Sequence, residues 1–242
     1  MPRPDRVLTG ERIAVYWHPL AVRLTHWVNA LCLLVLITSG LQILNAHPAL
    51  YWGAGSTFDH PFISFGSGDS APFPGWITLP SWQDLASGRR WHFFFAWILV
   101  INGLVYIANL IGGRHIRDLL PTLADLRAIP HTIAEHLKLR FPKGDAALSY
   151  NVLQKLAYLS VVIAFPILIL AGLTMSPAMD SAFPWLVPLF GGRQSARAVH
   201  FLVASYLVLF VLVHLVMVLI SGVFNNLRSM VTGRYRIEEE TP

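Results

Sequence analysis

Apolar residues are concentrated in four long stretches with very few charged side chains. The stretches lie at about 22–45, 91–112, 151–174 and 198–223. Each is close to the roughly 20 apolar residues that an α-helix needs to cross the hydrocarbon core of a bilayer. The third contains Pro166, which should kink a helix but is tolerated in a packed membrane bundle. The pattern predicts an all-α membrane protein, a single domain over 1–242 built as a four-transmembrane-helix bundle.

The two long connecting segments differ in character. Residues 46–90 are rich in Pro, Gly and aromatic side chains, which predicts little regular structure. This loop either rests on the lipid headgroups, as its Trp and Tyr favour, or forms a platform for a partner protein. In residues 113–150, apolar positions recur at helical spacing between charges. An amphipathic helix lying in the membrane interface is expected there.

The basic residues predict an orientation in the membrane. Fourteen of the 18 Lys and Arg residues fall on the side of the chain termini, and four fall on the opposite side: Arg89, Arg90, Arg193 and Arg197. Because positive charge is retained in the cytoplasm, both termini are expected to be cytoplasmic. This bias accounts for the net charge of +5, so no nucleic-acid partner is expected. The basic, polar N-terminal segment is too long for a cleaved signal peptide.

Composition and cysteine content narrow the chemistry. The chain is 55% hydrophobic and 13% charged, whereas soluble domains carry about 25% charged residues. Cys32 is the only cysteine. An intramolecular disulfide, a cysteine-ligated iron–sulfur cluster and covalent CxxCH haem attachment are therefore excluded.

Four of the ten histidines fall inside the apolar stretches, where ionisable groups are costly and usually functional. They are His26, His92, His200 and His214. In a helix, the 14 residues from His200 to His214 bring the two side chains to within about 40° of the same face, about 21 Å apart along the axis. That spacing suits one histidine near each membrane surface. The other six histidines are expected to be solvated or interfacial.

The direction of each span then pairs the histidines by depth. His92 and His200 are expected near the outer face, and His26 and His214 nearer the cytoplasmic face. Each pair comes from two different helices, which predicts bis-histidine axial ligation of two b-type haems. Two distant pairs do not supply the three or four ligands of a zinc site. The spans contain no Asp or Glu, which makes an ion transporter a poorer interpretation.

Two glycines share faces with these histidines. Gly40 follows His26 by 14 residues, and Gly103 follows His92 by 11. Gly40 would place a surface without a side chain beside the haem of His92 and His200, and Gly103 would do so beside the haem of His26 and His214. The alternative is small-residue packing between membrane helices.

Several segments together resemble the prokaryotic di-haem cytochrome b family, which includes membrane subunits of Ni,Fe-hydrogenases and formate dehydrogenases. The resemblance covers nearly the whole chain and is strongest to the branch called thiosulfate reductase cytochrome b subunit. The matching segments are RLTHWVNALCLLVLITSG (23–40), GRRWHFFFAWILVINGLVY (88–106), YNVLQKLAY (150–158) and GGRQSARAVHFLVASYLVLFVLVHLVMVLISG (191–222).

The resemblance implies a multi-pass protein of the bacterial inner membrane that passes electrons between the quinone pool and a periplasmic oxidoreductase, expected to be molybdopterin-dependent. It also implies a ubiquinone or menaquinone site near the cytoplasmic haem, at a motif like YNAGQK. Asn151, Gln154 and Lys155 match that motif, but Leu153 stands where the family has glycine. The alternative for Asn151 is a helix N-cap.

Arginines lie within about one helical turn of three of the histidines. Arg23, Arg89, Arg90 and Arg197 are candidates for charge-assisted bonds to haem propionates, or else serve only to set topology. Two further functions stay open. One is a stand-alone superoxide:quinone oxidoreductase whose outer arginines attract the anion. The other is a structural membrane anchor without haem.

Overall fold

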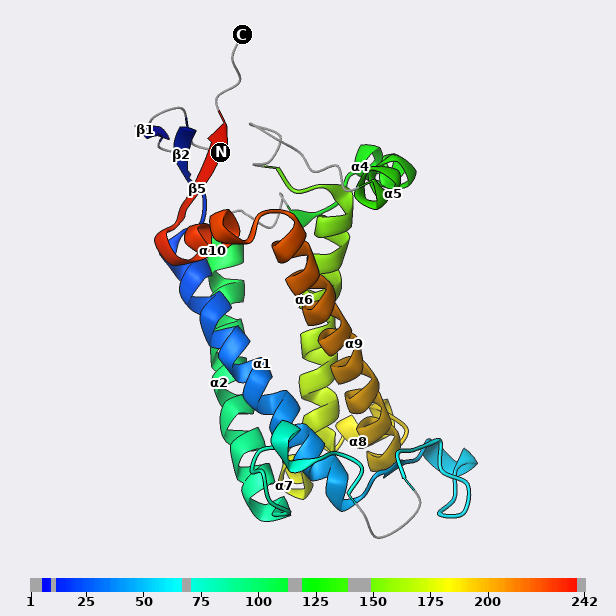
Figure 1. Ribbon diagram of the computed structural model, residues 1–242. Coiled ribbons are helices and arrows are strands. Elements are labelled where there is room, and N and C mark those ends of the chain that lie inside the picture. Colours follow the sequence, from blue (N-terminus) through cyan, green and yellow to red (C-terminus); the bar gives the residue numbers. More distant parts are fainter. Residues whose placement is uncertain (1–5, 10–11, 67–70, 113–118, 139–148, 239–242) are drawn as a thin grey trace. The chain divides into compact units, whose positions relative to one another are not determined.

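The computed structural model (Figure 1) describes residues 6–9, 12–66, 71–112, 119–138 and 149–238. The chain forms two compact units. Unit 1 comprises residues 1–27, 103–161 and 210–242, and unit 2 comprises residues 28–102 and 162–209. Each of the four long helices contributes one end to each unit.

The four long helices confirm the predicted spans. They are α1 (Leu20–Ala46), α2 (Leu85–Gly112), α6 (Val152–Thr174) and α9 (Arg193–Ile220). Helix α2 begins six residues before its predicted start, and α9 begins five residues before. In both, the helix includes a polar first turn, which the apolar pattern alone does not reveal. Helix α6 runs unbroken through Pro166.

All four helices are long and apolar enough to cross a membrane. In their most apolar stretches, only between 6% and 28% of the residues are buried within the protein. Large apolar side chains such as Leu34 and Phe94 are exposed. Apolar surface on this scale requires an apolar solvent, so this is a multi-pass membrane protein. Its orientation stays a prediction, and five of the counted basic residues (Arg3, Arg114, Arg117, Arg140 and Lys143) lie outside the described residues.

Unit 1 contains a small sheet that the sequence pattern did not predict. Strand β2 (Arg12–Tyr16) lies between β1 (Arg6–Thr9) and β5 (Arg234–Glu238), and both pairings are antiparallel. Val15 and Ile237 are buried. Strand β5 follows α10 (Val223–Thr232), which ends at Gly233 with a φ of +83°. A Cβ there would lie 2.7 Å from the Tyr16 ring, so this turn requires glycine.

The segment between α2 and α6 also belongs to unit 1. It forms the short helices α4 (Leu123–Arg127) and α5 (Ile129–Leu137), within the predicted amphipathic region. Residues 113–118 and 139–148 of that region lie outside the described residues.

Unit 2 contains the aromatic loop, which has more order than expected. It includes β3 (Ala49–Leu50) paired with β4 (Ile63–Ser64) and the 3-10 turns η1 (Gly53–Gly55) and η2 (Gly75–Ile77). The Asn45 amide holds the loop by bonding both the amide and the carbonyl of Phe73, each at 2.9 Å. Helices α7 (Pro177–Ala182) and α8 (Leu186–Leu189) connect α6 to α9.

Candidate haem sites

In unit 2, His92 of α2 faces His200 of α9. The ring centres are 6.1 Å apart and the planes are inclined by 61°. His200 Nδ1 donates to the carbonyl oxygen of Leu168 at 2.8 Å, and His92 Nδ1 lies 3.1 Å from Ser39 Oγ. A ring that uses Nδ1 as a donor leaves Nε2 free as a metal ligand. His200 is thus held in the tautomer that suits iron ligation, and the contact of His92 with Ser39 is compatible with the same tautomer.

Two glycines allow close approach to these rings. A Cβ on Gly172 would lie 3.2 Å from His200 Cε1, tighter than ordinary van der Waals contact. A Cβ on Gly40 would lie 3.5 Å from His92 Cε1, which is ordinary contact. Gly40 was predicted at the level of this pair, and it lies there. Gly172 was not among the predicted residues. It lies one helical turn after Leu168, whose carbonyl accepts the hydrogen bond from His200.

In unit 1, His26 of α1 faces His214 of α9. The ring centres are 6.2 Å apart and the planes are inclined by 58°. Phe210 stacks against His214 with ring planes 11° apart. His26 Nδ1 is buried and has no hydrogen-bond partner among the described residues. No described atom lies within 4 Å of the Cβ position of Gly103, so packing against protein does not explain that glycine.

Both pairs fit an iron atom between their rings. A metal bound to one nitrogen of each ring at about 2 Å places the ring centres about 6 Å apart, as observed in both pairs. Among the described residues, no group of three or more His, Cys, Asp or Glu could hold a metal ion. Sites with two protein ligands suit haem, because the porphyrin supplies the remaining four ligands.

The four arginines near the histidines have different surroundings. Arg23 donates to the carbonyl of Val231, and its Nε is buried without a partner among the described residues. Arg197 donates to the carbonyls of Ala49 and His47. Arg89 lies 5.5 Å from the centre of the Phe93 ring. Arg90 is exposed. The unpartnered Nε of Arg23 could receive an anionic group.

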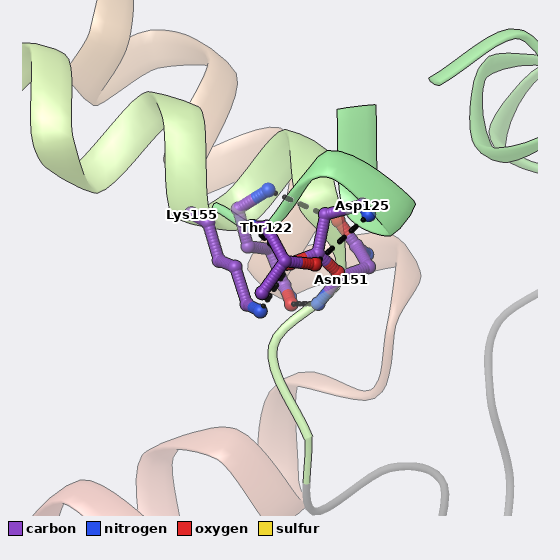
Figure 2. Close-up of polar contacts among 5 residues, drawn as sticks. Thr122, Asp125, Asn151 and Lys155 are labelled. Atoms are coloured by element: carbon purple, nitrogen blue, oxygen red, sulfur yellow. Dashed lines mark hydrogen bonds and ion pairs between the residues drawn. The ribbon is translucent and has the colours of Figure 1, made fainter. Parts of the chain in front are cut away.

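The start of α6 carries the three residues of the expected quinone motif, of which Asn151 and Lys155 are labelled in Figure 2. Asn151 Oδ1 accepts from the Gln154 amide, and Gln154 Oε1 accepts from the Asn151 amide, both at 3.0 Å. This is a capping box, so Asn151 does cap the helix. Lys155 Nζ donates to Asp125 Oδ2 at 2.8 Å, and the hydrogen bond from Lys155 is the main cause that lowers the pKa of Asp125 to about 2.

Two histidines outside the spans are less solvated than expected. Burial, with the nearby His26 and Arg23, lowers the pKa of His18 to about 4. His136 Nδ1 donates to Thr132 O at 2.8 Å, and its Nε2 lies 3.5 Å from Asn151 Nδ2. His136 therefore lies beside the quinone motif, although the two are 15 residues apart in the sequence.

Four membrane-length helices with facing histidines define a membrane cytochrome of the b class. Comparison with known proteins agrees: residues 17–233 match the family of prokaryotic cytochrome b561, and the chain belongs to that family. The predicted family and helical membrane fold are thereby confirmed. Membership implies b-type haem and a role in electron transport.

Relatives with assigned names are similar over most of their length. The chain is 35% identical over 202 residues to the putative protein-methionine-sulfoxide reductase subunit YedZ1 of Azospira oryzae, covering 83% of this chain and 89% of that protein. It is 26% identical over 250 residues to the probable Ni/Fe-hydrogenase B-type cytochrome subunit of Azotobacter vinelandii, covering 96% and 92%. A protein of the same description from Cupriavidus necator is 25% identical over 246 residues, covering 96% and 86%.

Proposed function

We propose that the protein carries electrons through two b-type haems between membrane quinone and a periplasmic oxidoreductase. The observation that carries this proposal is the presence of two separate histidine pairs, each with ring centres about 6 Å apart and each drawn from two helices. His92 and His200 would hold one haem, and His26 and His214 the other. Haem supplies reversible one-electron chemistry, and the protein tunes it through ligands, burial and charge.

The surrounding residues would fix each haem in place. Ser39 and the Leu168 carbonyl orient His92 and His200. Gly172 leaves room for the His200 ring and Gly40 lies beside the His92 ring, and Gly103 would face the other haem. Arg23, with its buried unpartnered Nε, is the strongest candidate for a propionate contact. Arg89, Arg90 and Arg197 are weaker candidates, because Arg197 already donates to two backbone carbonyls.

The quinone would bind in unit 1, near His26 and His214. Support comes from the polar groups gathered at the start of α6, where Asn151 and Lys155 meet His136 and Asp125. Gln154 would act through the cap that orders this turn. Quinone reduction takes up protons, so titratable and hydrogen-bonding groups beside the ring are required there.

The relatives support a redox partner for this chain, and the charge distribution supports its orientation in the membrane. The named relatives are subunits of a methionine-sulfoxide reductase or hydrogenases, so a redox partner is proposed for this chain too. We place it on the periplasmic side of the bacterial inner membrane, docked on the 46–90 loop, and expect a molybdopterin enzyme. Both chain termini are then cytoplasmic, in keeping with the basic residues.

The stand-alone superoxide:quinone oxidoreductase is less well supported. That function needs free cationic side chains near the His92–His200 site. Of the four outer arginines, Arg193 forms an ion pair with Asp180, and the Arg197 guanidinium is engaged by carbonyls. Only the exposed Arg89 and Arg90 would be available to an anion. Rapid reduction of the purified protein by superoxide in the absence of any partner would nevertheless favour that activity.

Haem content in single-histidine variants tests the proposal. The purified protein should contain two haems per chain. His92→Ala and His200→Ala should each lose the same haem, and His26→Ala and His214→Ala the other, as distinguished by low-temperature absorption and electron paramagnetic resonance. His60→Ala, which changes an exposed loop residue, should keep both. One haem per chain, or loss of the same haem in His26→Ala and His92→Ala, would contradict the proposal.

A further inference from the structure

The two histidine pairs differ in the hydrogen bonds of their Nδ1 atoms. His92 Nδ1 meets Ser39 Oγ and His200 Nδ1 meets the Leu168 carbonyl, whereas the buried His26 Nδ1 has no partner among the described residues. We infer that Ser39 and the Leu168 carbonyl give the haem of His92 and His200 the lower midpoint potential. This inference rests on the proposed function, in which each pair holds one haem.

A second contact of Ser39 indicates the direction of its hydrogen bond with His92. Ser39 Oγ donates its only hydrogen to the carbonyl oxygen of Val35 at 2.6 Å. Its oxygen is then available to accept from His92 Nδ1 at 3.1 Å. The Leu168 carbonyl can only accept, so the bond at 2.8 Å also runs from histidine to oxygen. The Leu36 carbonyl is a further acceptor for the His92 ring. With these acceptors, both rings of this pair are hydrogen-bond donors.

Such bonds favour the ferric state. When an imidazole ligand donates its second N–H to an oxygen, electron density at the coordinating nitrogen rises and the ligand becomes more basic. The more basic ligand stabilises the higher charge of ferric iron over ferrous iron, which lowers the potential. A ring that lacks such a partner gives less of this stabilisation. The haem whose two histidines both have hydrogen-bond acceptors should thus have a lower midpoint potential than the haem held by His26 and His214, because His26 has no acceptor among the described residues.

A glycine in α6 makes room for the hydrogen bond between His200 and the Leu168 carbonyl. Gly172 follows Leu168 by one turn, and any side chain at that position would press against His200, because even a Cβ would lie 3.3 Å from its Nδ1. The absence of a side chain lets His200 reach the Leu168 carbonyl oxygen at the side of α6. The hydrogen bond is therefore a consequence of close packing between α6 and α9 at this glycine.

Nearby cations do not reverse this order. Each pair has an arginine three residues before a ligand: Arg23 before His26 and Arg197 before His200. Each positive charge raises the midpoint potential of the haem beside it, so the two have opposite effects on the difference between the potentials. Arg89 and Arg90 precede His92 by three and two residues, but both are exposed, so water and salt screen their charges. The hydrogen bonds of the Nδ1 atoms are the difference between the sites on which this inference rests.

The potential difference gives electron transfer a favoured direction inside the protein. In such a transfer the haem held by His92 and His200 would lose one electron and the haem held by His26 and His214 would gain it, with no proton moved and no bond made or broken. With the two haems ordered in this way, the His92–His200 site is the better internal donor.

A redox titration of the purified protein and its Ser39→Ala variant tests this inference. The lower midpoint potential should rise in the variant while the upper one stays fixed. Loss of one hydrogen bond to a ligand changes the ratio of oxidised to reduced haem by up to about tenfold, which corresponds to about 59 mV for one electron. The matched control is Thr38→Ala, because Thr38 Oγ1 also bonds a helix carbonyl, that of Leu34 at 2.9 Å.

The outcomes separate this inference from the proposed function. Haem content is measured first, and fewer than two haems per chain would defeat the proposed function itself. With two haems present, unchanged midpoints in Ser39→Ala would overturn the inference alone, as would a rise in the upper midpoint. If Ser39→Ala fails to retain haem, a redox titration of His214→Ala tests the inference instead. Its remaining haem must titrate at the lower of the two wild-type midpoints, and titration at the upper one refutes the inference.

Discussion

Of the two glycines that lie against the His92–His200 pair, Gly172 leaves less room for a side chain than Gly40, so Gly172→Ala is an informative small substitution. The new methyl group would lie 3.2 Å from His200 Cε1 and 3.3 Å from Nδ1. Ordinary van der Waals contact needs 3.4 Å or more. The ring or α6 must therefore move by a few tenths of an ångström. That movement also lengthens the 2.8 Å hydrogen bond to Leu168.

The expected cost of Gly172→Ala can be estimated from three contributions. Overpacking of a tight contact costs about 1–3 kcal/mol. A weakened hydrogen bond adds about 1 kcal/mol. The better helix propensity of alanine offsets at most about 1 kcal/mol. The net destabilisation of the site is about 2 kcal/mol, which weakens haem binding by about 30-fold at this position.

Haem retention measures this effect. Purified Gly172→Ala protein is mixed with an excess of an apoprotein that captures haem, and the loss of each haem is followed by its absorption. The haem of His92 and His200 should be lost first, while the other haem is retained as in the wild type. Gly112→Ala is the control, because no described atom lies within 4 Å of its Cβ position. Equal retention of both haems in Gly172→Ala and Gly112→Ala would refute this account of Gly172.

Three further predictions concern unit 1. The folded-state pKa of Asp125 is about 2, below the ordinary 3.8, so its contribution to stability is fully present above about pH 4 and is lost as the pH falls toward 2. Asp125→Asn, which removes the ion pair with Lys155, should flatten the pH dependence of thermal unfolding between pH 5 and 2, and an unchanged slope would contradict this. Asn151→Ala should destabilise α6 by about 1 kcal/mol through loss of its N-cap, seen as a lower unfolding temperature than in Asn151→Asp, and equal temperatures would argue against the cap. Gly103→Ala should weaken binding of the haem of His26 and His214; retention of that haem equal to wild type would show that Gly103 does not face it.

The sequence-based predictions were most accurate for features that depend on the residues of a single helix. Apolar stretches mark the spans because every residue in them meets the same apolar solvent. The pairings of His200 with His92 and of His214 with His26 follow from helix geometry, since position along a straight helix fixes both depth and face. The structure brings both predicted pairs together. Whether haem occupies them stays a prediction.

Contacts made by backbone atoms or between distant segments were not predictable in this way. The partner of His200 is a carbonyl oxygen of Leu168, and every residue of α6 has such an oxygen. Strand β5 pairs with β2 more than 200 residues earlier in the chain, and neither strand is long enough to show a pattern. Asp125 and Lys155 come from separate segments. In each case the missing information is which surfaces meet, and the periodicity of one segment does not contain it.

In the proposed function, the hydrogen-bond partners of the histidines would let the same type of ligand give two haems different midpoint potentials. All four candidate ligands are histidines on long helices, so the ligand atoms alone do not distinguish the two sites. The distinction comes from atoms one step further out: a serine hydroxyl on α1 and a carbonyl on α6 for one pair, and a buried Nδ1 without a described partner for the other. Because α6 supplies no histidine ligand to either pair, its residues are free to adjust one potential without disturbing ligation. The helix that holds no iron ligand is therefore where differences in potential between relatives should be sought, at the positions that correspond to Leu168 and Gly172.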